Sequence, residues 1–191
     1  MARLALLLAA ALAGCATPQA ARQEAAGASC AAGATLQSRA GRAWWAENRW
    51  RYPGDAEAEA AYRRLAEQAS PWPDWYRPYD AVLPPGTRFQ MAIGGAQTPD
   101  QPGSFGTFDR IASVEDVRED LAVRSDWKPK VDRVVTYEVV EALPVLIGPV
   151  GPQIDSGLCA LLPGRWSQFQ AKVEKGTLRR YLKVIEVRAI R

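Results

Sequence analysis

Hydrophobic and polar residues follow two different periods along this chain, and the change of period divides it. Asp55 to Ala69 repeats apolar residues at helical spacing, starts with acidic residues and is followed by Pro71, which predicts a helix. Asp132 to Glu141 alternates apolar and polar residues and is the clearest predicted strand. The pattern therefore predicts a helical part before residue 71 and a strand-rich part after it.

The second part holds further short elements between turns rich in Pro and Gly. A helix is expected over Ser113 to Val123, because Ser113 can cap its first turn and Asp116 stands at the capping-box position. Further strands are expected at Phe89 to Ile93, Val145 to Ile147, Arg165 to Ala171 and Leu178 to Ile190. Together these elements predict an α+β domain, with a small, mostly antiparallel sheet and two or three short helices.

The N-terminus has the pattern of a bacterial lipoprotein signal peptide over residues 1–14. Arg3 is a short basic start, and the apolar run Leu4 to Ala11 is too short to span a bilayer. Leu12 to Cys15 resembles a lipobox, which implies cleavage before Cys15 and acylation of that cysteine with fatty acids such as palmitate. Ala16 follows the cysteine where Asp would signal inner-membrane retention, so the resemblance implies the outer membrane, with a periplasmic or surface-exposed domain. An ordinary secretory leader with a chance cysteine is the alternative.

Composition divides the rest of the chain into a tether and a folded body. Residues 15–41 are rich in Ala, Gly, Gln and Ser, which predicts a flexible tether behind the acylated cysteine. Residues 42–70 contain an aromatic cluster and the predicted helix, and residues 71–191 form the β-rich domain. The aromatic cluster is expected to cover a core edge, and a ligand platform is the alternative.

The residue types present restrict the chemistry. The chain of 191 residues has no histidine, which excludes a Ser-His-Asp triad, a Cys-His dyad and imidazole metal sites. Its 24 basic and 21 acidic residues are interspersed, and no basic stripe indicates nucleic-acid binding. We therefore expect no metal and no cofactor, and any catalysis would use carboxylates, Arg, Gln, Tyr or Ser.

Three cysteines allow one disulfide if the first is lipidated. Cys30 and Cys159 then remain, and pairing is the expected outcome in an oxidising periplasm. Two separate buried thiols are the alternative.

Several motifs of the β-rich part share an order and spacing. Leu83 to Thr87 reads L-P-P-G-T, Tyr137 to Val139 reads Y-E-V, Leu143 to Pro152 reads L-P-V-L-I-G-P-V-G-P, and Ser167 to Phe169 reads S-Q-F. Over roughly residues 72–182 they resemble the tuberculosis necrotizing toxin (TNT) family of NAD+ glycohydrolases. Typical members carry L-P-x-G-T, Y-x-V, L-P-V-x-x-G-P-x-A-P and G-T-Q-Y. The resemblance implies a toxin-like hydrolase with NAD+ as its substrate.

The resemblance also implies roles for individual residues. The family's glutamine, which lies at the bond that is cut, falls on Gln168, and Phe105 falls where an aromatic ring could stack on the ligand. The family's D-R-x-G is not matched, because Gln90 and Met91 occupy those positions, and a family histidine before Y-x-V is also absent. Arg88 lies two positions before Gln90, hence on the same side of a strand, and is the expected substitute for the missing arginine.

Each of these residues has a plain structural alternative. Gln168 can be an ordinary polar strand residue, Phe105 can belong to the core, and Arg88, Arg110 and Arg165 can be solvated surface side chains. Asp109 and Asp155 are carboxylates without an assigned role, and a turn aspartate such as Asp155 usually satisfies local backbone.

Three hypotheses therefore stay open at this point. The first is a lipid-anchored NAD+ glycohydrolase. The second is a catalytically decayed envelope lipoprotein of the same fold that binds a nucleotide-like ligand or an unknown protein partner. The third is a structural lipoprotein.

Overall fold

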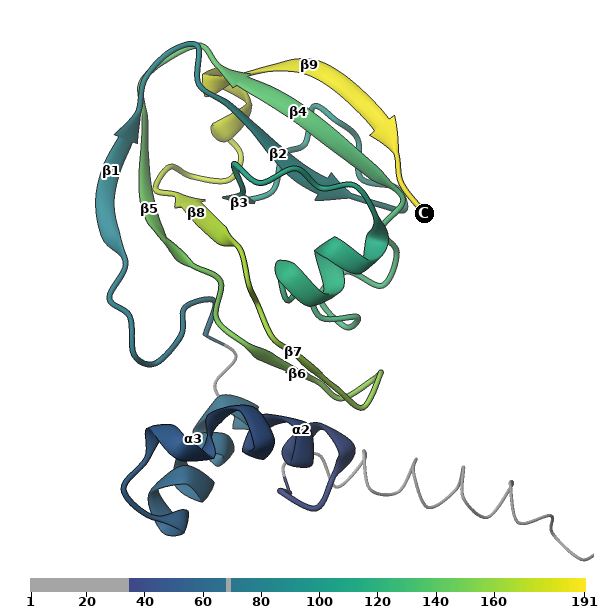
Figure 1. The fold of residues 1–191 in the computed structure, drawn as a ribbon. Helices are drawn as coiled ribbons and strands as arrows, with labels where there is room; N and C mark the ends of the chain where they lie inside the picture. The colour runs from purple at the N-terminus through teal and green to yellow at the C-terminus, as the bar shows by residue number, and fades with distance from the viewer. Residues whose placement is uncertain (1–34, 68–69) are drawn as a thin grey trace, which may run out of the picture.

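The computed structural model describes residues 35–67 and 70–191, and the signal peptide, Cys15 and Cys30 lie outside these ranges. Two helices form a unit at one end of the molecule, and strands form the rest (Figure 1). The helices are α2 (Arg39–Asn48) and α3 (Asp55–Glu67), joined by a 3-10 turn at Arg49–Arg51. No helix in the described ranges is long and apolar enough to cross a membrane.

The strands form an α+β domain, as the sequence predicts. The first sheet has the order β1-β5-β8-β3, from β1 (Tyr79–Leu83), β5 (Leu143–Pro149), β8 (Ser167–Ala171) and β3 (Phe105–Gly106). The second has the order β2-β4-β9, from β2 (Arg88–Ile93), β4 (Arg133–Val139) and β9 (Leu182–Ala189). A hairpin of β6 (Gln153–Asp155) and β7 (Ala160–Leu162) reaches toward the helices (Figure 1). All these pairings are antiparallel.

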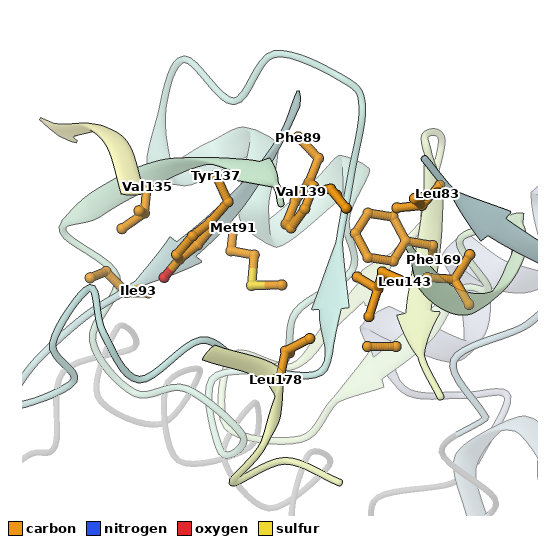
Figure 2. Close-up of a cluster of buried hydrophobic side chains, with 12 residues drawn as sticks. Leu83, Phe89, Met91, Ile93, Val135, Tyr137, Val139, Leu143, Phe169 and Leu178 are labelled. Atoms are coloured by element: carbon orange, nitrogen blue, oxygen red, sulfur yellow. The ribbon is translucent and has the colours of Figure 1, made fainter. Parts of the chain in front are cut away.

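The main core lies between the inner faces of the two sheets. Phe89 of β2 packs against Tyr137 of β4 and edge-on against Phe169 of β8, so that one aromatic group joins both sheets (Figure 2). The L-P-P-G-T motif makes the turn between β1 and β2, where Gly86 adopts a φ of 88°. Because successive side chains of a strand point to opposite faces, the residues that alternate with this cluster point away from the core.

The helical unit has a separate small core. Trp44 of α2 and Tyr62 of α3 pack against each other, and Ile154 of the β6-β7 hairpin joins them. Ser38 caps α2 by accepting a hydrogen bond from the Gly41 backbone at 2.9 Å. The helix therefore begins at Arg39, so residues 39–41 of the expected tether belong to the folded body.

Several predicted elements differ in detail from those observed. The capping box is present, because Ser113 Oγ accepts from the Asp116 backbone and Asp116 Oδ2 accepts from the Ser113 backbone, but the turn that follows is a π-helix over Asp116–Asp120. The last predicted strand was placed too early, because Leu178–Tyr181 forms a 3-10 turn that buries Leu178 completely. Strands β1, β3, β6 and β7 were not predicted from the sequence.

Candidate functional site

Gln168 is a buried side chain on the outer side of strand β8. It pairs with Gly148 of β5, and its neighbour Phe169 points into the core between the sheets. The side chain is only 8% exposed, and Nε2 donates a hydrogen bond to the Pro71 carbonyl oxygen at 2.6 Å. The amide is therefore held by the chain segment that leads from the helices to β1.

The segment Ser70–Pro73 lies closely against the Gly-Pro run of the L-P-V-x-x-G-P motif. The Gly151 backbone N–H donates to the same Pro71 carbonyl at 2.8 Å. A Cβ on Gly151 would lie 2.5 Å from the Trp72 carbonyl carbon, and one on Gly148 would lie 3.1 Å from the Trp72 ring. Glycine at position 151 is thus required for the close approach of the Trp72 backbone, whereas at position 148 it leaves room for the Trp72 ring, and the motif serves here to hold the segment that contacts Gln168.

The other two expected ligand-binding residues lie apart from a cavity. Arg88 is exposed on β2, and its Nε donates to Glu138 Oε2 across the sheet at 2.8 Å. Phe105 of β3 is 40% exposed and pairs with Gln170 rather than with Gln168. Neither Arg88, Phe105 nor Gln168 lines one of the two cavities described below. Their roles in binding stay predictions.

The remaining polar candidates are engaged in structural contacts. Gln90 Oε1 accepts from the Ile111 backbone at 2.8 Å, which gives the residue at the family's D-R position a structural role. Asp109 accepts from Ser167 Oγ at 3.1 Å, and Arg165 contacts Asp120 at 3.3 Å. These side chains organise the loops that flank β8.

Asp155 accepts one hydrogen bond from the local Leu158 backbone, as expected for a turn aspartate, and two from Ser125, which is distant in the chain. Burial opposes its ionisation, but hydrogen bonds from Ser125 and from the Leu158 backbone lower the pKa of the carboxyl below its usual value. The arrangement stabilises a carboxylate that cross-links the β6-β7 hairpin to the Ser125 loop.

A cavity of about 400 Å³ lies between the helical unit and the segment that continues from Ser70 to Pro78. Aromatic rings and proline form much of its wall, together with Leu65 and Ala61 of α3. Three arginines and one carboxylate line it: Arg51, Arg64, Arg77 and Asp74. The cavity therefore combines aromatic surface with an excess of positive charge.

Asp74 is shared between two donors at the edge of this cavity. Arg51 donates to Asp74 Oδ1 at 2.9 Å, and the Tyr52 hydroxyl donates to Oδ2 at 3.0 Å. The Arg51 guanidinium also lies over the rings of Tyr52 and Trp75. Burial and the Asp74 hydrogen bond raise the pKa of Tyr52. This group joins the 3-10 turn after α2 to the segment before β1.

Arg64 and Arg77 are the other two cationic side chains of the cavity. Both are exposed, and in the described ranges neither takes part in an ion pair. Sequence reasoning missed them, because they come from α3 and from the segment before β1 and belong to no motif. The one signal was the density of Trp, Tyr and Pro over residues 72–78.

A second cavity of about 370 Å³ lies beside β4 and β9. Its walls include Pro99, Asp100 and Arg179, and Tyr137 lies at its base. The Tyr137 hydroxyl donates to the Pro99 carbonyl at 2.6 Å, and burial together with Asp100 raises the pKa of this tyrosine to about 12. The hydroxyl thus anchors the 99–102 loop in its protonated form.

Cys159 adopts a φ of 52° in the turn between β6 and β7. Its expected partner Cys30 lies outside the described residues, so the pairing stays a prediction.

Comparison with solved structures finds chains of similar fold. Tne2, solved in complex with Tni2, matches with a TM-score of 0.52 and 19% identity over 62% of this chain and 97% of that chain. The domain shares the fold of Tne2. This likeness supports the TNT-like fold implied by the sequence motifs. Tse6, solved in complex with Tsi6, matches with a TM-score of 0.40 and 16% identity over 75% of this chain and 91% of that chain. Neither a known protein family nor a curated protein matches this sequence.

Proposed function

We propose that this chain is a lipid-anchored envelope protein whose TNT-like domain binds a ligand and does not hydrolyse NAD+. The observation that carries the proposal is the contact between Gln168 and Pro71. The one side chain that the TNT resemblance assigns to the scissile bond is buried and donates its amide hydrogen to backbone.

The chemistry of NAD+ hydrolysis explains why this contact matters. Breaking the bond between nicotinamide and ribose passes through a cationic, oxocarbenium-like transition state, which needs an acceptor close to the sugar ring. The contact with Pro71 uses the Gln168 amide N–H, and because the residue is only 8% exposed, a sugar ring has full access to its amide only when the Ser70–Pro73 segment moves away. The substrate's diphosphate would also need arginine donors, and the guanidinium of Arg88 is paired with Glu138.

NAD+ hydrolysis is the competing function. Retention of Gln168 and of the Gly-Pro run favours it, and so does the TNT-like fold. It requires that a sugar ring reaches the Gln168 amide oxygen beside the Ser70–Pro73 segment.

Nicotinamide release distinguishes these two functions. The full-length protein is incubated at high concentration with NAD+, and free nicotinamide is quantified by chromatography. We expect no turnover above that of buffer alone. Turnover that is lost in Gln168→Ala and retained in Gln170→Ala would overturn the proposal, because Gln170 lies on the same side of β8 but pairs with Leu146 and Phe105. A nucleotide screen by thermal shift then tests for ligand binding.

The envelope address is part of the same proposal and rests on the lipobox that ends at Cys15. Wild-type protein is expected in the outer-membrane fraction, with fatty acids on its terminal cysteine by mass spectrometry. Cys15→Ser is expected to leave the membrane fraction, because the acyl chains are its proposed anchor. Unmodified wild-type protein in the soluble fraction would contradict the address.

A protein partner is also included in the proposal. Tne2 was solved in complex with a second protein, which supports a search for such a partner of this chain.

A further inference from the structure

We infer that the cavity between α3 and the Ser70–Pro78 segment is the ligand site of this protein, and that it takes a planar aromatic ring carrying a dianionic phosphate, as in a nucleoside monophosphate. The inference rests on the proposed ligand-binding function and adds its location and ligand class. The cavity is separate from the three residues that the TNT resemblance singles out, since none of them lines it.

The size and walls of the cavity suit a small planar compound. Its volume of about 400 Å³ falls in the range of pockets that hold small molecules. The half-buried rings of Trp72 and Tyr76 line the cavity and offer aromatic surface against which a base could pack. Proline at positions 73, 78 and 152 adds rigid apolar wall, against which an ion would lose part of its hydration at a cost in free energy.

The charges of the cavity define the other half of the ligand. Arg51 is matched by Asp74 and stacked against two rings, so its charge is already balanced by the protein. Arg64 and Arg77 remain, and two guanidinium groups facing one cavity match the two negative charges of a phosphate monoester. Arg64 and Tyr52 line the same cavity, so the charged and the aromatic parts of its wall lie together.

The aromatic wall and the two arginines together determine the ligand class, because neither feature is sufficient alone. A neutral aromatic compound would leave the two arginines unmatched, and inorganic phosphate would leave the ring faces unused. A ligand that carries both groups uses both parts of the wall.

Isothermal titration calorimetry on the full-length protein tests the inference with AMP, adenosine and inorganic phosphate as probes. We expect saturable AMP binding, with adenosine and phosphate each at least tenfold weaker. Arg64→Gln and Arg77→Gln are each expected to weaken AMP binding at least tenfold. Arg63→Gln is the matched control, because Arg63 is the exposed neighbour of Arg64 on α3 and pairs with Glu59 outside the cavity. Its AMP affinity should stay within twofold of wild type.

Two outcomes would overturn the inference: no AMP binding at millimolar concentration, or AMP binding unchanged in both Arg64→Gln and Arg77→Gln. Both arginines are exposed and without ion pairs in the described ranges, so the two variants should fold. Their thermal melting midpoints, measured beside wild type, check this. Binding of another nucleotide that is insensitive to both substitutions would leave the proposed ligand-binding function standing and remove only this site. Conversely, nicotinamide release that depends on Gln168 would overturn the proposed function, whereas the Arg64→Gln and Arg77→Gln titrations test this cavity by themselves.

Discussion

The amide nitrogen of Gln168 lies 2.6 Å from the carbonyl oxygen of Pro71, although the two residues are 97 positions apart in the chain. This bond ties the segment between α3 and β1 to the strand that carries the motif glutamine. Gln168 is therefore expected to contribute to the stability of the fold, in addition to being a candidate site residue.

We therefore expect Gln168→Ala to destabilise the protein by about 1–3 kcal/mol, the range for losing a buried hydrogen-bonded side chain. Gln170→Ala on the same strand should cost less than about 0.5 kcal/mol, because Gln170 is only half-buried. Urea unfolding of the two variants provides the comparison. Equal losses for the two substitutions would show that the Pro71 contact contributes nothing.

Gly151→Ala is expected to displace the Ser70–Pro73 segment. The new Cβ would lie 2.5 Å from the Trp72 carbonyl carbon, and relieving this overlap requires a backbone shift that costs about 1–3 kcal/mol. Gly103→Ala is the control, because a Cβ there has no neighbour within 4 Å. The midpoint of thermal unfolding should fall for Gly151→Ala and stay near wild type for Gly103→Ala. A fall of the same size in both variants would argue against this close approach.

Stability is expected to decrease at alkaline pH through Tyr137. Its pKa is raised to about 12 in the folded state, from the ordinary value of 10, so the folded protein holds the phenol proton more tightly than the unfolded chain. The resulting stabilisation is complete below pH 10 and is lost as the pH rises from 10 to 12. With 1.36 kcal/mol per pKa unit, the loss is about 2–3 kcal/mol.

Tyr137→Phe provides the comparison, because it keeps the ring against Phe89 and removes the hydroxyl. The pH dependence of urea unfolding between pH 9 and 12 should be shallower in this variant than in wild type. Identical slopes would mean that Tyr137 titrates normally.

A disulfide between Cys30 and Cys159 is expected to stabilise the oxidised protein by about 5 kcal/mol in the chain-entropy model. Peptide mapping under non-reducing conditions should yield one cross-linked peptide that contains both cysteines. Reduction should lower the free energy of unfolding in wild type but have no effect in the double variant Cys30→Ser, Cys159→Ser. Two unlinked thiol peptides in protein isolated from the envelope would refute the pairing.

The sequence predicts well the elements that are determined by local rules. The α3 helix starts at Asp55 as expected, with acidic residues in its first turn, and Ser113 with Asp116 forms the expected capping box. Strand β4 follows the expected alternation because one face is buried against the core. Short strands such as β6 and β7 were missed, because three residues carry too little periodicity and form strands only by pairing with each other.

The site was less predictable than the fold because it depends on distant contacts. The motif places Gln168 correctly on a strand, but nothing in its neighbourhood reveals that Pro71 will cover it. Likewise, Arg64 and Arg77 line one cavity because tertiary contacts, among them the Arg51–Asp74 pair, bring the helical unit and the segment before β1 together. Residues that come together from distant segments in this way form no motif of fixed spacing in the sequence.

The Ser70–Pro73 segment has two sides, and each faces a different candidate site. Ser70, Trp72 and Pro73 line the arginine-bearing cavity, while the Pro71 carbonyl holds Gln168. An occupant that fixes this segment in place would favour the conformation in which the motif glutamine is shielded, and uncovering the glutamine would in turn reduce affinity for that occupant. Binding in the cavity would therefore reduce access to Gln168, and access to Gln168 would reduce binding in the cavity by the same factor.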